Sequence, residues 1–358
     1  MDEVILRGSS VPVLDRHVRP WRDLRISVMD RCNFRCPYCM PDSTYHAGFR
    51  FLAPRERLDF DEIVRVARVA AEMGVTKLRL TGGEPLLRPG LADLVARLVR
   101  IPGIDDVALT TNGVLLARMV PALHAAGLHR VTVSLDSLDE VVFARLSGGR
   151  AELAAVLEGI ETARAADFSG GVKINAVIQR GVNDSGVPAL LARYRHTGVV
   201  VRFIEYMDVG NRNGWERAHV VNSRELLERI EAIWPLERLS PHYRGEVARR
   251  YRYRDGGGEI GFISSVTAPF CGDCSRARLS SDGRIYTCLF ATTGTELRAL
   301  LRDARHAADD GPLREALSQI WRQRTDRYSE ERAERRAGAA ASPDTRQGDK
   351  IEMHYIGG

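Results

Sequence analysis

Six short runs rich in β-branched and apolar residues alternate with amphipathic stretches along the first part of the chain, and this alternation constrains the fold most. Strands that alternate with helices predict a parallel sheet built from right-handed βα units. Six such units predict the α/β class and a partial (β/α)6, TIM-like barrel. The predicted strands are 24–30, 77–82, 106–111, 130–136, 172–179 and 199–208, and the predicted helices are 59–73, 91–99, 115–126, 153–166 and 188–195.

Three cysteines with the spacing Cys-x3-Cys-x2-Cys follow the first predicted strand, at Cys32, Cys36 and Cys39. A structural zinc site is closed by four ligands. Three thiolates can instead hold three irons of a cubane iron–sulfur cluster and leave the fourth iron open to a small molecule. A loop with buried or zinc-bound cysteines is the alternative, but zinc sites usually pair cysteines two apart on each arm. The first pair of this triplet does not fit that spacing.

The remaining three cysteines form a second triplet, which consists of Cys271, Cys274 and Cys288. Taken alone, this triplet also fits a zinc site with three cysteines and one histidine. Beside the first triplet, a second cluster with its own open iron is the better interpretation. No cysteine of the chain is then left over.

Polar and small residues gather where the predicted strands end. The first triplet follows strand one, Thr81-Gly82-Gly83-Glu84 ends strand two, Thr110-Thr111-Asn112-Gly113 ends strand three, and Ser134-Leu135-Asp136 ends strand four. In β/α barrels the carboxyl ends of the strands build the active site. Turn formation alone explains the Asn-Gly pair, but it does not explain why thiols and hydroxyls gather at the same end.

The first triplet resembles the signature of radical S-adenosylmethionine (SAM) enzymes. Both triplets, together with Thr81-Gly82-Gly83-Glu84-Pro85-Leu86 and the terminal Gly357-Gly358, resemble the GTP 3′,8-cyclase family of molybdenum-cofactor biosynthesis over nearly the whole chain. The resemblance implies two 4Fe–4S clusters and SAM as cofactors. It also implies conversion of GTP to 3′,8-cyclo-7,8-dihydro-GTP through a 5′-deoxyadenosyl radical.

The resemblance assigns roles to individual positions. The two triplets, Cys32, Cys36, Cys39, Cys271, Cys274 and Cys288, become the iron ligands. The expected SAM contacts are Tyr38, Gly83, Ser134 and Met207. The expected GTP contacts are Arg25, Arg79, Thr110, Lys173, Arg276 and Arg278. The expected catalytic positions are Arg276, Arg278, Gly357 and Gly358.

Lysine is scarce in this chain. Almost every basic position is an arginine, and the only lysines are Lys77, Lys173 and Lys350. A lysine can mark a place where a compact ammonium is needed instead of a flat guanidinium. Lys173 is the informative one, because it lies inside an apolar strand pattern. An unpaired buried charge is costly there, so an anionic partner is expected.

The domain organisation follows from where the βα pattern stops. Residues 1–214 are expected to form the radical SAM partial barrel. Residues 215–328, with hairpins over 247–266 and 278–290, are expected to form an α+β cap that carries the second cluster. The stretch 329–349 is expected to be a flexible linker, and the charge run from Arg324 to Arg336 a solvated helix face or linker. The apolar, aromatic tail 350–358 is expected to enter the active site.

Composition and charge narrow the compartment and the partners. The net charge is +5, with both signs mixed along most of the chain, which fits a polyanionic small substrate as well as a nucleic acid. No apolar run approaches the ~18 residues of a membrane span, and the start lacks the features of a signal peptide. A cytoplasmic enzyme with neither nucleic-acid nor membrane partner is expected.

The resemblance further implies a flavodoxin or ferredoxin as electron donor, a cyclic pyranopterin monophosphate synthase downstream, and a homodimer as one form of assembly. Two alternatives stay open at this level. One is a peptide-modifying radical SAM enzyme with an auxiliary cluster. The other, from a different class, is a zinc-stabilised RNA-binding protein.

Overall fold

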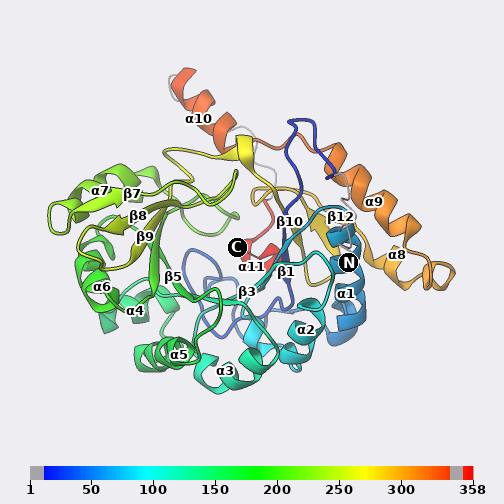
Figure 1. The fold of residues 1–358 in the computed structure, drawn as a ribbon, viewed down its shortest axis with the longest axis horizontal. Helices are drawn as coiled ribbons and strands as arrows, with labels where there is room; N and C mark the ends of the chain where they lie inside the picture. Colours follow the sequence, from blue (N-terminus) through cyan, green and yellow to red (C-terminus); the bar gives the residue numbers. More distant parts are fainter. Residues whose placement is uncertain (1–11, 339–349, 358) are drawn as a thin grey trace, which may run out of the picture.

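The computed structural model describes residues 12–338 and 350–357, which form one curved, twelve-stranded sheet with helices around it (Figure 1). Its strand order is β12-β11-β10-β1-β2-β3-β4-β5-β6-β9-β8-β7. The strands from β1 to β6 pair in parallel in the order of the sequence, so the predicted (β/α)6 partial barrel is confirmed. This half contains β1 (Asp23–Ser27), α1 (Phe60–Glu72), β2 (Lys77–Thr81), α2 (Leu91–Leu98), β3 (Asp106–Thr111), α3 (Leu116–Ala125), β4 (Arg130–Ser134), α4 (Glu140–Ser147), α5 (Leu153–Ala165), β5 (Val172–Ile178), α6 (Val187–Tyr194) and β6 (Val200–Glu205).

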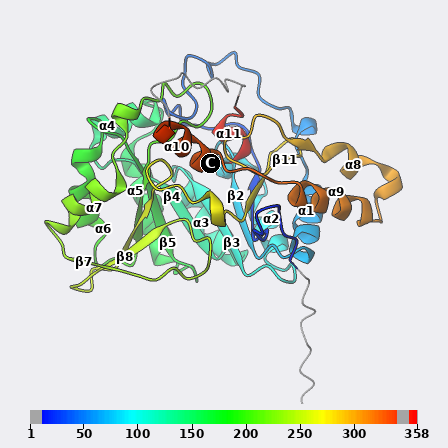
Figure 2. The same ribbon diagram turned by 90° about the horizontal axis from the view of Figure 1, so that it is seen from above.

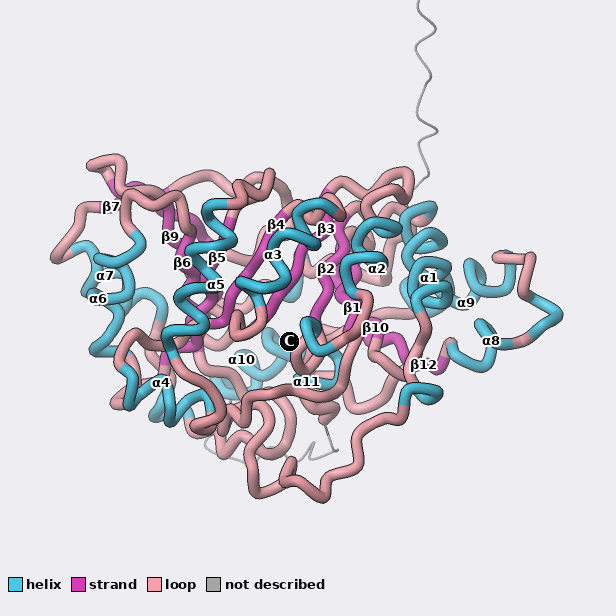
Figure 3. Tube along the Cα trace, turned by 90° about the horizontal axis from the view of Figure 1, so that it is seen from below, coloured by secondary structure: helices cyan, strands magenta, loops and turns pink. Residues whose placement is uncertain are grey.

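The predicted strands and helices are all present, and their ends differ from the observed ends by at most three residues. Strands one and six were predicted too long because their apolar pattern continues into loops that leave the sheet. Helix α4 was not predicted. The helices cover the outer face of the parallel strands, as Figure 3 shows for α2, α3 and α5. Buried apolar side chains between the two layers, such as Leu24, Ile26, Leu80, Val107 and Leu109, form the core.

The C-terminal region extends the sheet at both of its edges. Strand β9 pairs in parallel with β6, and β10 pairs in parallel with β1. The two predicted hairpins are present, because β8 is antiparallel to β9 and β10 is antiparallel to β11. The region is thus joined to the barrel by backbone hydrogen bonds along whole strands and does not pack as a separate layer. It contains α7 (Ser223–Glu231), β7 (Leu236–Arg238), β8 (Arg249–Tyr253), β9 (Glu259–Ile263), β10 (Arg276–Leu279), β11 (Arg284–Tyr286), β12 (Thr295–Glu296), α8 (Arg298–Arg302), α9 (Gly311–Arg322), α10 (Tyr328–Gly338) and α11 (Met353–Ile356).

Helix α9 returns to the barrel and packs beside α1 (Figure 2). The guanidinium of Arg65 on α1 donates to Asp310 at 2.8 Å and to the carbonyl of Asp309 at 2.8 Å. The indole of Trp321, at the end of α9, stacks on Trp21 beside β1, with ring centroids 5.5 Å apart. The chain after α9 is therefore held next to the first strand of the sheet.

The prediction of a flexible linker over 329–349 is wrong for its first part, because α10 spans Tyr328–Gly338. The charge alternation there stabilises a helix, since Arg327 pairs with Glu330 three residues later at 2.7 Å. The ring of Tyr328 stacks on Phe290 at 4.3 Å, and the buried Arg332 forms an ion pair with Asp208. Residues 339–349 lie outside the described residues. In the described ranges, no helix is long and apolar enough to cross a membrane.

Candidate active site

One cavity of about 560 Å³ runs along the inner face of the sheet, and residues from both the amino and the carboxyl ends of the parallel strands line it. It receives side chains from β1 to β6, from β10, and from the loops that carry both cysteine triplets. Of the predicted site residues that the structure describes, all but Gly357 line this cavity: Arg25, Cys32, Cys36, Tyr38, Cys39, Arg79, Gly83, Thr110, Ser134, Lys173, Met207, Cys271, Cys274, Arg276, Arg278 and Cys288. The sequence pattern therefore identified residues that the fold brings together.

The first triplet lies in the loop that follows β1. A tight turn brings Cys36 and Cys39 together, because Cys39 donates its backbone N–H to the Cys36 carbonyl at 3.0 Å. The guanidinium of Arg35 fixes the loop by donating to the carbonyls of Cys32 and Tyr45, at 2.7 and 2.8 Å. Burial, and then the charge of Glu84, raise the pKa of Cys32 to about 12. Burial, and then the charges of neighbouring thiolates, raise the pKa values of Cys36 and Cys39 well above the ordinary thiol value.

The glycines after β2 make room for this loop. A Cβ on Gly82 would lie 2.2 Å from the Met29 carbonyl, and a Cβ on Gly83 would lie 2.3 Å from the Arg31 carbonyl. Gly83 donates its N–H to the Met29 carbonyl at 2.7 Å. Their missing side chains therefore serve the close backbone approach that positions Cys32.

Glu84 completes the motif from inside the protein, with 1% of its surface exposed. Its carboxylate accepts hydrogen bonds from the Thr111 hydroxyl and from the backbone N–H of Asn112, both at 2.8 Å, and from the N–H of Leu86 at 2.9 Å. Burial outweighs these bonds and raises the pKa of Glu84 to about 7. The side chain thus ties the end of β2 to the end of β3, beside the first triplet.

The expected SAM positions surround the same loop. The Tyr38 hydroxyl donates to the Asp136 carboxylate at 2.6 Å, and that carboxylate also accepts from the N–H of Val177 at 2.8 Å. Burial raises the pKa of Asp136 to about 6. Ser134 ends β4, and Met207 follows β6. Tyr38, Ser134 and Met207 line the same cavity as the first triplet.

A row of arginines crosses the first strands on the inner face of the sheet. Arg25 on β1 is paired in register with Arg278 on β10 and with Arg79 on β2. Burial first, and then the neighbouring arginines, lower the pKa of Arg25 well below its usual value. Arg278 is 3% exposed, and its buried Nε has no hydrogen-bond partner among the described residues. Aligned buried cations of this kind call for a polyanionic partner.

The row continues across β3 to β6 with polar side chains. Arg79 donates from Nη1 to the hydroxyls of Thr110 at 3.0 Å and Thr132 at 3.3 Å. Lys173 is the register partner of Thr132. The pKa of Lys173 is lowered to about 7. Burial is the largest cause, and the charges of Arg202 and other arginines add to it. A compact ammonium poised between its charged and neutral forms therefore faces the cavity.

The second triplet lies at the two ends of the hairpin formed by β10 and β11. Cys271 and Cys274 precede β10, and Cys288 follows β11. Burial raises the pKa of Cys288 to about 12, and it also raises the pKa of Cys271. Cys274 differs, because the charges of Arg276 and Arg324 outweigh its burial and lower its pKa to about 6.

The C-terminal tail returns to the centre of the arc of strands, where Figure 1 shows α11. Met353 and His354 line the cavity. Gly357 has a φ of +74°, and a Cβ there would lie 2.3 Å from the buried Thr81 hydroxyl. Gly358 lies outside the described residues, so its predicted role has no structural account.

Several residues of this cavity were not predicted from the sequence. They include Arg130, Asn175, Tyr243 and Arg324. Arg202 donates to Asn175 at 2.9 Å, and this pair has a sequence signal, since both residues alternate with apolar neighbours along strand patterns. Tyr243 lies in a loop without a distinctive pattern and has no such signal.

The residues present fit the cofactors that the cysteines imply. Each triplet supplies three thiols to one wall of the same cavity, and thiolates are the ligands of iron–sulfur clusters. Most of these thiols have raised pKa values, so iron binding would have to displace their protons. The iron ligands would be the two triplets, and the space between them is bordered by the arginine row.

Comparison with known proteins agrees with the iron–sulfur interpretation of the cysteine triplets. The family model described as "Radical SAM superfamily" matches residues 26–193, and that described as "Molybdenum Cofactor Synthesis C" matches residues 199–330. The two matches meet just before β6, earlier in the chain than the predicted domain boundary at residue 214. A [4Fe–4S] cluster and SAM are implied by membership of the first family.

Among solved structures, that of Streptococcus suis SuiB bound to S-adenosylmethionine has a TM-score of 0.58 and 17% identity, and covers 84% of this chain and 69% of that chain. The structure of anSMEcpe with bound AdoMet and Kp18Cys peptide has a TM-score of 0.52 and 15% identity, and covers 83% of each chain. At these identities the likeness concerns the fold alone, and it confirms the predicted barrel.

Relatives in sequence are much closer. A GTP 3′,8-cyclase of Acidothermus cellulolyticus is 52% identical over 360 residues, which cover 97% of this chain and 99% of that protein. One of Xanthomonas axonopodis pv. citri is 51% identical and covers 98% and 100%, and one of Staphylococcus aureus is 45% identical and covers 97% and 99%. The chain therefore belongs to the GTP 3′,8-cyclase family of the radical SAM superfamily.

Proposed function

We propose that this enzyme converts GTP to 3′,8-cyclo-7,8-dihydro-GTP, the first step of molybdenum-cofactor biosynthesis. The observation that carries the proposal is the arginine row of Arg25, Arg79 and Arg278, which lies between two thiol triplets in one cavity. Arginine forks suit phosphate oxygens. A nucleoside triphosphate is a polyanion of the right kind for such a row, and the similar proteins described above are named GTP 3′,8-cyclases.

The first triplet would hold the cluster, and Tyr38, Gly83, Ser134 and Met207 would surround SAM. When bound and reduced, this cluster supplies the electron that cleaves SAM to methionine and a 5′-deoxyadenosyl radical, which removes the 3′ hydrogen of the ribose. The hydrogen bond from Tyr38 to Asp136 fixes the ring of Tyr38 in the cavity wall. The protein's part is to orient both ligands and to exclude water from between them.

The second triplet would hold a second [4Fe–4S] cluster that faces the guanine end of the substrate. The proposed contacts to GTP are Arg25, Arg79, Thr110, Lys173, Arg276 and Arg278. Arg276 and Arg278 follow Cys274 on β10, so both lie within reach of a ligand held beside this triplet. Gly357 and Gly358 are proposed to approach the same ligand, since the tail residues Met353 and His354 already line the cavity.

The partners follow from this chemistry. A low-potential donor such as a flavodoxin or ferredoxin would reduce the first cluster, and a cyclic pyranopterin monophosphate synthase would consume the product. Thiols that must stay reduced for cluster assembly suit the cytoplasm. We retain a homodimer as part of the proposal, to be tested by the mass of the reconstituted protein in solution.

The test is anaerobic reconstitution followed by incubation with SAM, dithionite and one nucleoside triphosphate at a time. We expect about eight irons per chain, and 5′-deoxyadenosine together with a cyclised nucleotide when GTP is supplied. ATP in place of GTP serves as the matched control, because it keeps the triphosphate and changes the base. Equal turnover of ATP, or 5′-deoxyadenosine formed without any change in GTP, would contradict the proposal.

A further inference from the structure

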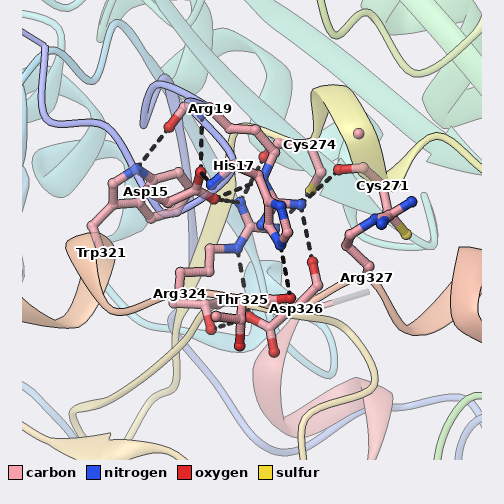
Figure 4. A network of polar contacts seen from close by, with 12 residues as sticks. Asp15, His17, Arg19, Cys271, Cys274, Trp321, Arg324, Thr325, Asp326 and Arg327 are labelled. Atoms are coloured by element: carbon pink, nitrogen blue, oxygen red, sulfur yellow. Dashed lines mark hydrogen bonds and ion pairs between the residues drawn. The ribbon is translucent and has the colours of Figure 1, made fainter.

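Three segments that are distant in the sequence meet behind the second triplet (Figure 4). They are the N-terminal stretch from Asp15 to Arg19, the turn of Cys271 and Cys274, and the residues after α9 around Arg324. The acid and the two arginines of this cluster are nearly or completely buried. Nothing in the proposed reaction uses Asp15 or Arg19, and their burial requires an explanation, because buried charges are costly unless they are paired.

Arg324 contacts Cys274 twice. Its Nη2 donates to the thiol sulfur at 3.2 Å, and its Nη1 donates to the carbonyl oxygen at 2.6 Å. The same Nη1 lies 3.5 Å from the Asp15 carboxylate, and the side chain is 1% exposed. Both terminal nitrogens of Arg324 therefore have protein partners. The residue is fixed against Cys274 and does not offer a free fork to a substrate.

Arg19 holds the other end of the same turn. Its Nε donates to Asp15 at 2.6 Å, and its Nη1 donates to the carbonyls of Cys271 at 2.7 Å and Asp326 at 2.9 Å. The Trp321 indole donates to the Arg19 carbonyl at 3.0 Å. The carbonyls of both cysteines are thus fixed by two arginines that share one buried carboxylate, Asp15.

The three thiols of the triplet differ in what donates to them. Cys274 receives charged donors from two sides, since Nη2 of Arg276 lies 3.3 Å away and Nη2 of Arg324 lies 3.2 Å away. The thiol of Cys288 receives the backbone N–H of Phe290 at 3.4 Å, and Cys271 also receives backbone N–H groups. Charge-assisted bonds are the stronger kind, so negative charge on Cys274 is stabilised most.

Resting on the proposed second cluster, we propose that Arg324 is a positioning residue that fixes Cys274 as a ligand and makes reduction of that cluster more favourable. Hydrogen bonds to sulfur and the net charge around a cluster set its reduction potential. Reduction adds negative charge, and a guanidinium 3.2 Å from a ligand sulfur stabilises that charge. Asp15 and Arg19 would act one step further away, by holding Arg324 and Cys271 in place.

The experiment is a redox titration of the reconstituted full chain, followed by electron paramagnetic resonance. A second preparation, in which Cys32, Cys36 and Cys39 are all replaced by Ala, identifies the signal of the second cluster. Arg324→Met removes the charge and both donors but keeps much of the side-chain volume. Arg322→Met is the matched control, because Arg322 is exposed and lies only two residues away.

We expect reduction of the second cluster to become about tenfold less favourable in Arg324→Met, which is a shift of about 59 mV to more negative potential. Arg322→Met should leave the potential unchanged, and Arg324→Lys, which keeps the charge but not the fork, should recover part of the shift. Equal potentials in Arg324→Met and Arg322→Met would overturn the proposal.

Three further outcomes are decisive. If Arg324→Met keeps its circular dichroism and the first cluster but loses the irons of the second, the positioning role is supported. If Arg324→Met does not fold, Arg324→Gln, which removes the charge but keeps a polar side chain, decides, and a wild-type potential in that variant overturns the proposal. If the preparation without the first triplet holds no cluster at all, the proposed second cluster fails, and this result is distinct from an unchanged potential.

Discussion

Arg25 on β1 and Arg278 on β10 are register partners on neighbouring parallel strands, although one lies near the start of the chain and the other near its end. The strand β10 therefore does more than extend the sheet beside β1. It places a second arginine beside the first, on the inner face, where both line the cavity. Two buried like charges so close together are costly unless an anion lies between them, so a bound polyanion should depend on both arginines.

Arg278→Ala should weaken the binding of GTP about 10- to 100-fold and should barely change the binding of guanosine. The lost interaction is a charge-assisted bond to phosphate, which contributes about 1.5–3 kcal/mol. Isothermal calorimetry with both ligands measures the difference. Arg284→Ala is the control, because Arg284 lies on the adjacent strand β11 with a side chain that is 42% exposed. Equal losses for GTP and guanosine would mean that Arg278 supports the fold instead.

Arg276→Ala should likewise weaken the binding of GTP more than that of guanosine. It should also disturb the second cluster, because Arg276 contacts Cys274.

The affinity for GTP should fall as the pH rises above about 7. In the free protein, burial and neighbouring arginines lower the pKa of Lys173 to about 7. A bound triphosphate would favour the ammonium form and raise that pKa, so binding takes up a proton above pH 7 and weakens by up to about tenfold per pH unit. Lys173→Met should lose this dependence, and the difference between the two proteins cancels the titration of GTP itself. Parallel pH profiles would argue against a role for Lys173.

Lys173→Arg should impair turnover although it keeps a positive charge. Lys173 lies between Thr132 on β4 and Val200 on β6, and Arg202 already occupies the neighbouring space on β6. A guanidinium is larger and flat, so it would displace the cavity wall or the substrate. Steady-state kinetics with GTP would test this, and normal turnover by the arginine variant would disprove the inference drawn from the scarcity of lysine.

The two triplets should fail differently when one thiol is removed. Cys36→Ala should abolish formation of 5′-deoxyadenosine, because the first cluster loses a ligand. Cys274→Ala should keep part of that activity but stop cyclisation. Iron analysis of each variant should show about four irons fewer than the wild type. Wild-type cyclisation by Cys274→Ala would rule out a catalytic second cluster.

The sequence predicted most where the residues follow a regular spacing, as in the alternating strands and the cysteine triplets. The strand alternation predicted β1 to β6, and the cysteine spacing predicted two thiol sites that share one cavity. Arg324 and Arg332 were misjudged, because an alternating charge run reads as a solvated surface. Both are buried, and their partners Asp15 and Asp208 lie far away in the sequence. Pairing of this kind depends on the tertiary fold and leaves no local pattern.

The same limit applies to how the C-terminal region joins the barrel. The hairpins were predicted from their turns, which lie at Gly256-Gly257-Gly258 and Ser281-Asp282-Gly283. Their parallel pairing with β6 and β1 was not, since nothing in β9 or β10 alone specifies a distant partner strand. The expected contact between Gly83 and SAM stays a prediction, and the contact that requires glycine at positions 82 and 83 in the structure is the loop at Met29 and Arg31.

The C-terminal tail contacts the first triplet directly. The backbone N–H of His354 donates to the sulfur of Cys39, and the His354 ring packs edge-on against Tyr45 at 4.8 Å. Before it, Lys350 donates to the Asp208 carbonyl at 3.0 Å, and Glu352 accepts from the N–H of Asn211 at 3.1 Å. The tail is thus anchored by residues 350–354, upstream of its two glycines.

Because the anchor precedes them, deleting Gly357 and Gly358 should leave the fold and both clusters intact but stop 3′,8-cyclisation. Iron content, circular dichroism and SAM cleavage should match the wild type, while the cyclised product disappears. Gly357→Ala should reproduce much of this loss, since a Cβ would lie 2.3 Å from the Thr81 hydroxyl and φ is +74°. Ile351→Val, a mild change upstream of the glycines, serves as the control. A truncated protein that still converts GTP at the parental rate would show that the two glycines have no part in the reaction.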